Sequence, residues 1–338
     1  MGLNEERNLE PPAPFEAEMR RRLWSQIHLV NGCPARRGGN GHPVTTAPSN
    51  CNDSDLFPSM AKLPDDHGRG TEMVFCELHR DVGDCLARLK SGAHGEHRDP
   101  ASQLEILVDF ESKLEQITRK CDTSAPLHLF TVLAGRSVAT QLRFSVHAGA
   151  HFSEDPETDR SILDPRVFLL ESAIDIIECD AELRSNQTLQ PFLWHPVVQF
   201  PFDAFVFVLR ELRDGLGGEE RSAAWVAVNR VYEDHPEFVT RGGVPLYAAV
   251  GDLAVRAWDV AVKAGAAGEM GPGGFEGLVE SHALARLREE RALRRVGLSG
   301  GDECGESGAK GEEGELGWGA WQQMLHDAGY WQGFASRA

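Results

Sequence analysis

The sequence predicts an all-α protein, and three observations support this fold class. Apolar residues recur at spacings of three and four along most of the chain, as on one face of a helix. No window shows the strict alternation of an exposed strand, and no βαβ rhythm appears. No repeat of fixed period is present, so we expect an irregular multi-helix domain rather than a solenoid. We divide the chain into a lead-in at 1–13, a helical domain at 14–296 and a tail at 297–338.

The first predicted helix covers roughly residues 14–30. Pro14 suits its first turn, where the missing N–H of proline costs no hydrogen bond. Acidic residues follow close behind, near the positive end of the helix dipole. Spacings of four predict one apolar stripe, formed by Met19, Leu23 and Ile27 with Trp24 and Val30 beside it.

Three consecutive arginines, Arg20, Arg21 and Arg22, lie on the rest of this helix surface. Glu18 is placed to meet Arg21 or Arg22 at helical spacings of three or four. Two interpretations stay open: the arginines bind a small acidic ligand or hold an inhibitory contact, or they pair with local acids and pack their stems on neighbours. On an acidic protein we favour the structural interpretation.

A long loop rich in Gly, Pro, Asn and Asp follows at residues 31–70. Loops of this length inside a compact domain are uncommon unless something fixes them. Asn52, Asp53, Ser54 and Asp55 are suited to do so through Asx-type turns and bonds to nearby N–H groups. We expect the loop to lie against the arginine helix, with Asp53 or Asp55 meeting Arg20 or Arg21.

Helical patterns continue from residue 71 to the end of the domain, and the first four of them open with a start signal. The expected helices are one capped by Thr71 that carries Val74, Leu78, Val82, Cys85 or Leu86, and Leu89; one from Ser102 with Leu107, Phe110, Leu114 and Ile117; one from Pro126 with Leu129, Leu133 and Leu142; one from Asp164-Pro165 with Val167, Leu170, Ile174 and Ile177; a buried one from about Asp203; and others near 219–234, 243–265 and 275–296.

Two linked strings in the first 60 residues resemble a known family. One string reads P-F-E-x-E-x-R-R-R-x-W, and its residues here are Pro14, Phe15, Glu16, Glu18, Arg20, Arg21, Arg22 and Trp24. The other reads N-x-x-D-S-D-L-x-P, and its residues here are Asn50, Asp53, Ser54, Asp55, Leu56 and Pro58. Shorter likenesses follow at Phe192-Leu193-Trp194, Phe200-Pro201-Phe202-Asp203-Ala204, Leu209-Arg210-Glu211-Leu212 and Ala224-Trp225.

These strings resemble the fungal-specific transcription factor domain, the all-helical middle homology region of fungal zinc binuclear-cluster regulators. The resemblance implies a nuclear role in transcription, in the control of a secondary-metabolite or other metabolic gene cluster. In that family this region modulates activity, while a separate zinc cluster reads DNA. The candidate structural or regulatory residues implied here are Glu18, Arg20, Arg21, Arg22, Trp24, Asn50, Asp53 and Asp55.

The six-cysteine zinc cluster of that family is absent from this sequence. The seven cysteines are scattered and form no C-x-x-C pair, a pattern that suits free thiols in a reducing compartment. We therefore expect no cofactor in this chain, and zinc only if an N-terminal cluster precedes it. The chain is then either a shortened relative of the family or the product of a truncated gene model.

Net charge limits the partners that this chain can bind directly. The formal charge is −18, which disfavours both a broad DNA-binding face and an anionic membrane surface. We expect DNA contact only through a partner or a missing N-terminal module. Expected partners are other transcription factor subunits or coactivators, with a second copy of the chain as an alternative.

The tail from Gly297 combines acidic residues and glycines with a late aromatic group. One interpretation is an acidic activation segment that displays aromatic side chains to a coactivator. The other, which we favour, is a Gly/Glu linker followed by a short helix packed on the domain. The aromatic group consists of Trp318, Trp321, Tyr330, Trp331 and Phe334.

Enzyme chemistry has little support in the sequence. His94 and His97 form a histidine pair, but zinc needs three or four ligands and the surrounding loop offers no third His or Cys. His79 and Cys85 lie on different helix faces, and Gly268–Gly274 lacks the Lys-Ser/Thr of a phosphate-binding loop. We predict a regulator rather than an enzyme. An accessory protein that partners a full-length regulator and a helical enzyme of unknown reaction stay as alternatives.

Overall fold

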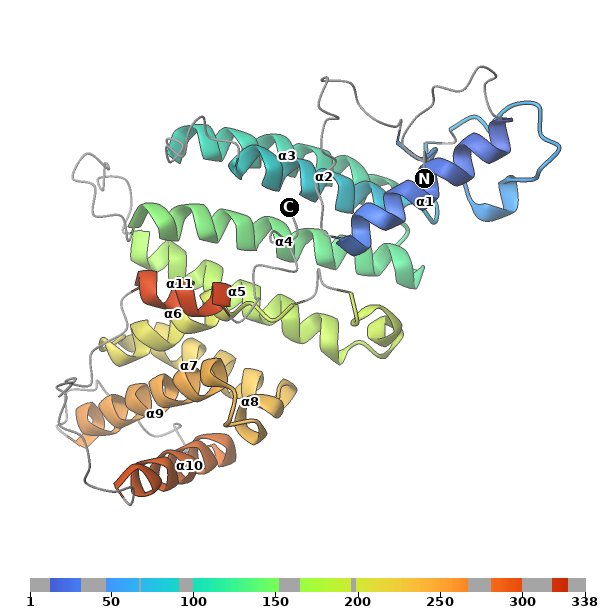
Figure 1. Ribbon diagram of the computed structural model, residues 1–338. Helices are drawn as coiled ribbons and strands as arrows, with labels where there is room; N and C mark the ends of the chain where they lie inside the picture. The colour runs from blue at the N-terminus through green and yellow to red at the C-terminus, as the bar shows by residue number, and fades with distance from the viewer. Residues whose placement is uncertain are drawn as a thin grey trace, which may run out of the picture. The chain divides into compact units, whose positions relative to one another are not determined.

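The computed structural model describes residues 13–31, 47–66, 68–90, 100–151, 165–195, 199–266, 281–299 and 318–327. Within these ranges the regular elements are all helices, which confirms the all-α class (Figure 1). The lead-in before residue 13, the histidine pair near residue 95, Gly268–Gly274 and most of the tail lie outside the described residues. No helix in the described part of the chain has the length and apolar character needed to cross a membrane.

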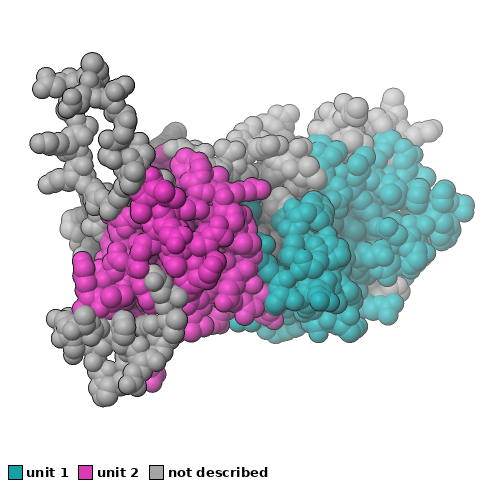
Figure 2. All heavy atoms as spheres, turned by 90° about the horizontal axis from the view of Figure 1, so that it is seen from below, with its two compact units in different colours: residues 1–150, 183–199, 329–338 teal, residues 151–182, 200–328 magenta. Residues whose placement is uncertain are grey.

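The chain divides into two compact units (Figure 2). Unit 1 comprises residues 1–150, 183–199 and 329–338, and unit 2 comprises residues 151–182 and 200–328. Each unit has a buried core of its own.

The described residues of unit 1 form the long helices α1 (Pro14–Asn31), α2 (Val74–Lys90), α3 (Pro100–Lys120) and α4 (Pro126–His151). A short 3-10 turn at Asp53–Asp55 and another at Gln187–Phe192 complete it. The core contains the stripes predicted for α2, α3 and α4, including Leu78, Leu107, Phe110, Ile117 and Leu133. The apolar periodicity therefore identified these helix faces correctly.

α1 departs from the predicted pattern. Met19 and Leu23 are 41% and 51% exposed, so the first part of the expected apolar stripe does not face the core, whereas Trp24 and Ile27 are partly buried. The buried positions are the charged Glu18 and Arg22 instead. The reason is that the following loop covers this face of α1 with hydrogen-bonding groups, which a guanidinium and a carboxylate satisfy better than apolar side chains.

The described residues of unit 2 form most of α5 (Pro165–Ser185) and six further helices. These are α6 (Phe202–Arg213), α7 (Gly218–Asp234), α8 (Glu237–Thr240), α9 (Pro245–Ala266), α10 (His282–Ser299) and α11 (Trp318–Asp327). α6 is buried along nearly its whole length and contacts α7, α9 and α11. A helix that is apolar on all sides belongs inside a core, which agrees with the buried helix predicted from about Asp203.

Buried polar contacts hold α5 to this core. His235 is 1% exposed, and its Nε2 lies 2.7 Å from Oδ2 of Asp180 on α5 while its Nδ1 lies 3.1 Å from Oε1 of Glu237 on α8. Its ring stacks on Phe238 at 4.8 Å. Val167 of α5, predicted to be buried, is 39% exposed because its helix turns other positions toward the core.

The described part of the tail forms α11, in which Trp321 is 4% exposed and the helix contacts α6. A short helix packed on the domain is what the structural interpretation of the tail predicts. The activation interpretation concerns residues outside the described ones and stays a prediction.

Candidate regulatory site

A polar contact between α1 and the loop after it lies at the centre of the predicted site. We call it the Arg22 anchor and define it as Glu18, Arg22, Cys51 and Asp53. Arg22 Nε donates to Glu18 Oε1 at 3.1 Å, and Nη2 donates to the Cys51 carbonyl at 2.6 Å. Nη1 pairs with the Asp53 carboxylate. One guanidinium therefore bridges its own helix and two loop residues.

The helix period explains how α1 supplies this contact. Glu18 and Arg22 are four residues apart and so share one face. Glu18 is fully buried, and its carboxylate also accepts from Arg21 Nη1 at 3.3 Å and from the backbone N–H of Ser49 at 3.0 Å. A buried carboxylate needs such a set of donors, because removal from water is otherwise very unfavourable.

Asn50 fixes the loop on the other side of the anchor. Its Oδ1 accepts from the Thr71 hydroxyl at 2.7 Å, and its Nδ2 donates to Asp66 Oδ1 at 2.8 Å and to the Arg69 carbonyl at 2.9 Å. Thr71 Oγ1 in turn accepts from the Met73 N–H at 3.2 Å, just before α2 begins. One amide thus joins the loop to the start of α2.

The 3-10 turn at Asp53–Asp55 is closed by its own polar residues. Asp55 Oδ2 accepts from the Asn52 N–H at 2.9 Å, and Asn52 Oδ1 accepts from the Glu72 N–H at 3.1 Å. Glu72 Oε2 accepts from the Asp53 N–H at 2.8 Å. These Asx-type contacts are of the kind predicted from the sequence.

The partner predicted for the loop carboxylate was wrong in one respect. Asp53 meets the arginine helix as expected, but it pairs with Arg22 rather than with Arg20 or Arg21. Arg20 pairs with Glu16 on the exposed side of α1 at 2.5 Å, and Arg21 pairs with Glu18. The described part of the loop bonds to the face shared by Glu18 and Arg22, which places Asp53 beside Arg22.

The eight predicted site residues therefore fall into three groups. Glu18, Arg21, Arg22 and Asp53 are joined by ion pairs, while Asn50 and Asp55 shape the adjacent loop. Arg20 lies outside the anchor, and Trp24 is partly buried on α1.

Charge and burial act in opposite directions at the anchor. Burial lowers the pKa of Arg22, but the hydrogen bond to Glu18 and the neighbouring acidic groups raise it above its ordinary value overall. Burial raises the pKa of the Cys51 thiol, although the Arg22 charge opposes this shift. At neutral pH the anchor therefore combines a permanent cation with a protonated thiol.

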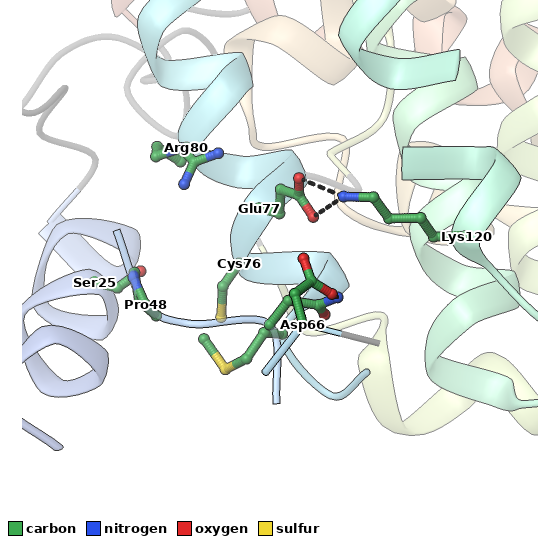
Figure 3. Close-up of a pocket in the computed structure, with 9 residues that line it drawn as sticks. Ser25, Pro48, Asp66, Cys76, Glu77, Arg80 and Lys120 are labelled. Carbon is green, nitrogen blue, oxygen red and sulfur yellow. Dashed lines mark hydrogen bonds and ion pairs between the residues drawn. The ribbon is translucent and has the colours of Figure 1, made fainter. Parts of the chain in front are cut away.

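A small cavity of about 210 Å³ lies beside the anchor (Figure 3). α1, the loop, α2 and α3 all contribute to it, through Ser25, Pro48, Asn50, Asp66, Met73, Cys76, Glu77, Arg80 and Lys120. Apart from Asn50, sequence reasoning did not single out these residues for this site. Their spacing carries no signal, because four separate segments bring them together.

The described residues contain no group of three or more His, Cys, Asp or Glu side chains arranged to hold a metal ion. What the site does supply is mixed charge: two carboxylates and two cations around a cavity, next to a buried ion pair. Such an arrangement can fix the loop against α1, or it can bind a small polar ligand.

No protein-family profile matches the chain, and no solved structure matches it. The chain is 32% identical to the aurofusarin cluster transcription factor of Gibberella zeae over 272 residues, which are 77% of this chain and 40% of that protein. It is 26% identical to a pyriculol/pyriculariol biosynthesis cluster transcription factor of Pyricularia oryzae over 283 residues, 77% of this chain and 37% of that protein.

A transcriptional regulator of Aspergillus aculeatus is 23% identical over 287 residues, which are 80% of this chain and 38% of that protein. The chain thus spans about two fifths of the length of the curated relatives that it matches. Over most of its own length, the chain is related to fungal transcription regulators, among them factors named for biosynthetic gene clusters.

Proposed function

We propose that this chain is the regulatory region of a fungal transcription regulator that controls a secondary-metabolite gene cluster in the nucleus. The observation that carries the proposal is the 32% identity, over 77% of the chain, to a transcription factor named for the aurofusarin cluster. More specifically, we propose that the chain corresponds to the middle homology region of zinc-cluster regulators, which its sequence resembles.

The chain is proposed to act on transcription without gripping DNA itself. Its formal charge is −18, whereas binding to phosphates requires clustered Lys and Arg. The three consecutive arginines of α1 do not supply such a cluster, since each pairs with an acidic side chain of its own unit. DNA contact would then come from a partner or from an N-terminal module that carries the zinc cluster.

Protein partners are the proposed route by which the chain acts. Other transcription factor subunits or coactivators fit this role, with a second copy of the chain as the alternative. No reaction is proposed, because the site described above combines structural ion pairs with a polar cavity rather than a nucleophile beside a base.

Deletion of the gene in the source organism tests the proposal. Transcripts of clustered biosynthetic genes are measured in the parent and the deletion strain under conditions in which the product is made. We expect the transcripts of one cluster to change together by several-fold. Unchanged transcripts of every such cluster would reject the proposed function. Tight, salt-sensitive and sequence-specific binding of the purified chain in a gel-shift assay would reject its DNA-independent part.

A further inference from the structure

We propose that the cavity beside the Arg22 anchor binds a small zwitterionic metabolite of amino-acid size. The inference goes beyond the proposed function, because binding to the purified chain can be measured without DNA, partners or transcription. It rests on the volume of the cavity, the charges around it and the weak contacts that hold one of those charges.

The volume limits the size of the ligand. About 210 Å³ holds a molecule of roughly ten non-hydrogen atoms, well below the 300–1,000 Å³ of sites that take drug-sized compounds. A small amino acid fills such a space.

The charges favour a ligand that carries both signs. Asp66 and Glu77 contribute two carboxylates, and Arg80 and Lys120 contribute two cations, so the lining is neutral overall. A dicarboxylate would meet repulsion from Asp66 and Glu77, and a diamine would meet repulsion from Arg80 and Lys120. A zwitterion places each of its charges near an opposite one.

The arrangement of these groups gives the ligand a direction. Figure 3 shows Arg80 above Cys76 and Asp66 to its right, with Glu77 between them and joined to Lys120. The ligand carboxylate would meet the Arg80 guanidinium, whose planar fork matches a carboxylate. The ligand ammonium would lie toward Asp66, and a short side chain would contact Met73 and Cys76.

Arg80 is held only by long contacts to the next residue. Its side chain is 41% exposed, whereas that of Asp81 is 10% exposed, and the two bonds between them are 3.3 and 3.4 Å long. Because these distances exceed the length of about 2.7–2.9 Å of a charge-assisted hydrogen bond, the Arg80 guanidinium is not firmly bound. Glu77 and Lys120, by contrast, are held at 3.1 Å and are only about a quarter exposed, so they form a fixed wall.

Cys76 lines the cavity with a thiol that is not nucleophilic. Its side chain is 8% exposed, and its Sγ accepts from Gln26 Nε2 at 3.4 Å. Burial raises the pKa of this thiol, so it stays protonated at neutral pH and acts as an apolar surface rather than a nucleophile. Gln26 also lies one helical turn after Arg22, which links the cavity to the anchor.

Thermal unfolding of the full chain with a panel of small compounds tests this proposal. The panel contains L-alanine, L-serine and L-threonine, with succinate and putrescine as the compounds of a single charge sign. We expect at least one of the amino acids at millimolar concentration to raise Tm by about 2 °C or more. Succinate and putrescine should leave Tm unchanged.

Two arginine variants then test whether the ligand binds in this cavity. Arg80→Gln should weaken the binding of the amino acid by about tenfold in a calorimetric titration, since a charge-assisted contact is lost. Arg119→Gln, an exposed arginine of α3 paired with Glu115, should bind within about twofold of the parent. Circular dichroism confirms that both variants fold. A panel in which no amino acid shifts Tm, a shift by succinate or putrescine alone, or equal affinity in Arg80→Gln would overturn the proposal.

Discussion

The Nη2 atom of Arg22 lies 2.6 Å from the carbonyl oxygen of Cys51, so that a side chain of α1 holds the backbone of a loop 29 residues further along the chain. The same guanidinium bonds the fully buried carboxylate of Glu18. Because the charge of Arg22 compensates that of Glu18, the helix and the loop depend on each other. This dependence makes the Arg22 anchor the first feature to test.

Replacement of Arg22 by alanine should destabilise the chain strongly. Glu18 would remain buried with one fewer cationic partner, and the Cys51 carbonyl would lose a donor. We expect a loss of about 2–3 kcal/mol in the free energy of unfolding, measured by urea denaturation. The matched control is Arg20→Ala, which removes a more exposed pair with Glu16 and should cost at most about 0.5 kcal/mol. Equal losses in the two variants would contradict the anchor.

Acid should weaken unit 1 through two histidines. Burial lowers the pKa of His79 to about 4, with a further contribution from His195, and burial lowers the pKa of His195 to about 4 as well. Their rings lie 5.7 Å apart. Both imidazoles are neutral in the folded chain, so below pH 6.5 the unfolded chain binds more protons. Stability should therefore fall as pH falls from 6.5 to 4, by about 2 kcal/mol or more for the pair.

His79→Phe isolates this effect, because phenylalanine keeps an aromatic ring beside Phe75 and does not titrate. The variant should lose less stability than the parent between pH 6.5 and pH 4, as measured by urea denaturation at each pH. An identical pH dependence in parent and variant would show that His79 is not buried in its neutral form.

Gly70 should tolerate no side chain. Its N–H donates to the Lys120 carbonyl at 2.8 Å, and an added Cβ would lie 2.7 Å from that same oxygen and 3.0 Å from His128. Gly70→Ala should therefore cost about 1–3 kcal/mol in thermal or chemical unfolding. Gly149→Ala on the exposed side of α4, where nothing lies within 4 Å, should instead stabilise the chain by up to about 1 kcal/mol. A neutral Gly70→Ala would refute this packing.

Tyr232 should be replaceable by phenylalanine. Its side chain is 4% exposed, its hydroxyl has no hydrogen-bond partner in the described part of the chain, and burial raises its pKa. Removing an unpaired buried hydroxyl should be neutral or stabilising by about 1 kcal/mol. Thr131→Val removes a hydroxyl that donates to the Leu127 carbonyl at 2.7 Å, and it should cost about 1 kcal/mol. A clear loss of Tm in Tyr232→Phe would reveal a partner for its hydroxyl.

The helices were predictable because their apolar spacing is local information. Leu78, Phe110 and Leu133 recur with the helical period and lie in the core as expected. For α1 the same rule predicted the wrong buried face. The helical period also places Glu18 and Arg22 on one face, and the path of the loop decides that this face is covered. That path also makes Arg22 the partner of Asp53. The spacing of residues within the two family-like strings does not reveal this pairing.

Other features depend on contacts between distant segments and leave no local signal. His235 and Asp180 are 55 residues apart and meet only after α5, α7 and α8 have packed. The cavity beside the anchor likewise draws on four segments, with Lys120 reaching Glu77 from a separate helix. Residue types alone do not select such pairs from the many acids and bases in the chain.

The most direct test of the proposed regulatory role is a tethered reporter assay. The chain is fused to a heterologous DNA-binding domain and expressed with a reporter of intermediate basal activity, so that activation and repression are both visible. We expect a several-fold change in reporter activity relative to the DNA-binding domain alone, retained in Arg20→Ala and lost or reduced in Arg22→Ala. Reporter activity equal to that of the DNA-binding domain alone, with the fusion present at the same level, would contradict the proposed role.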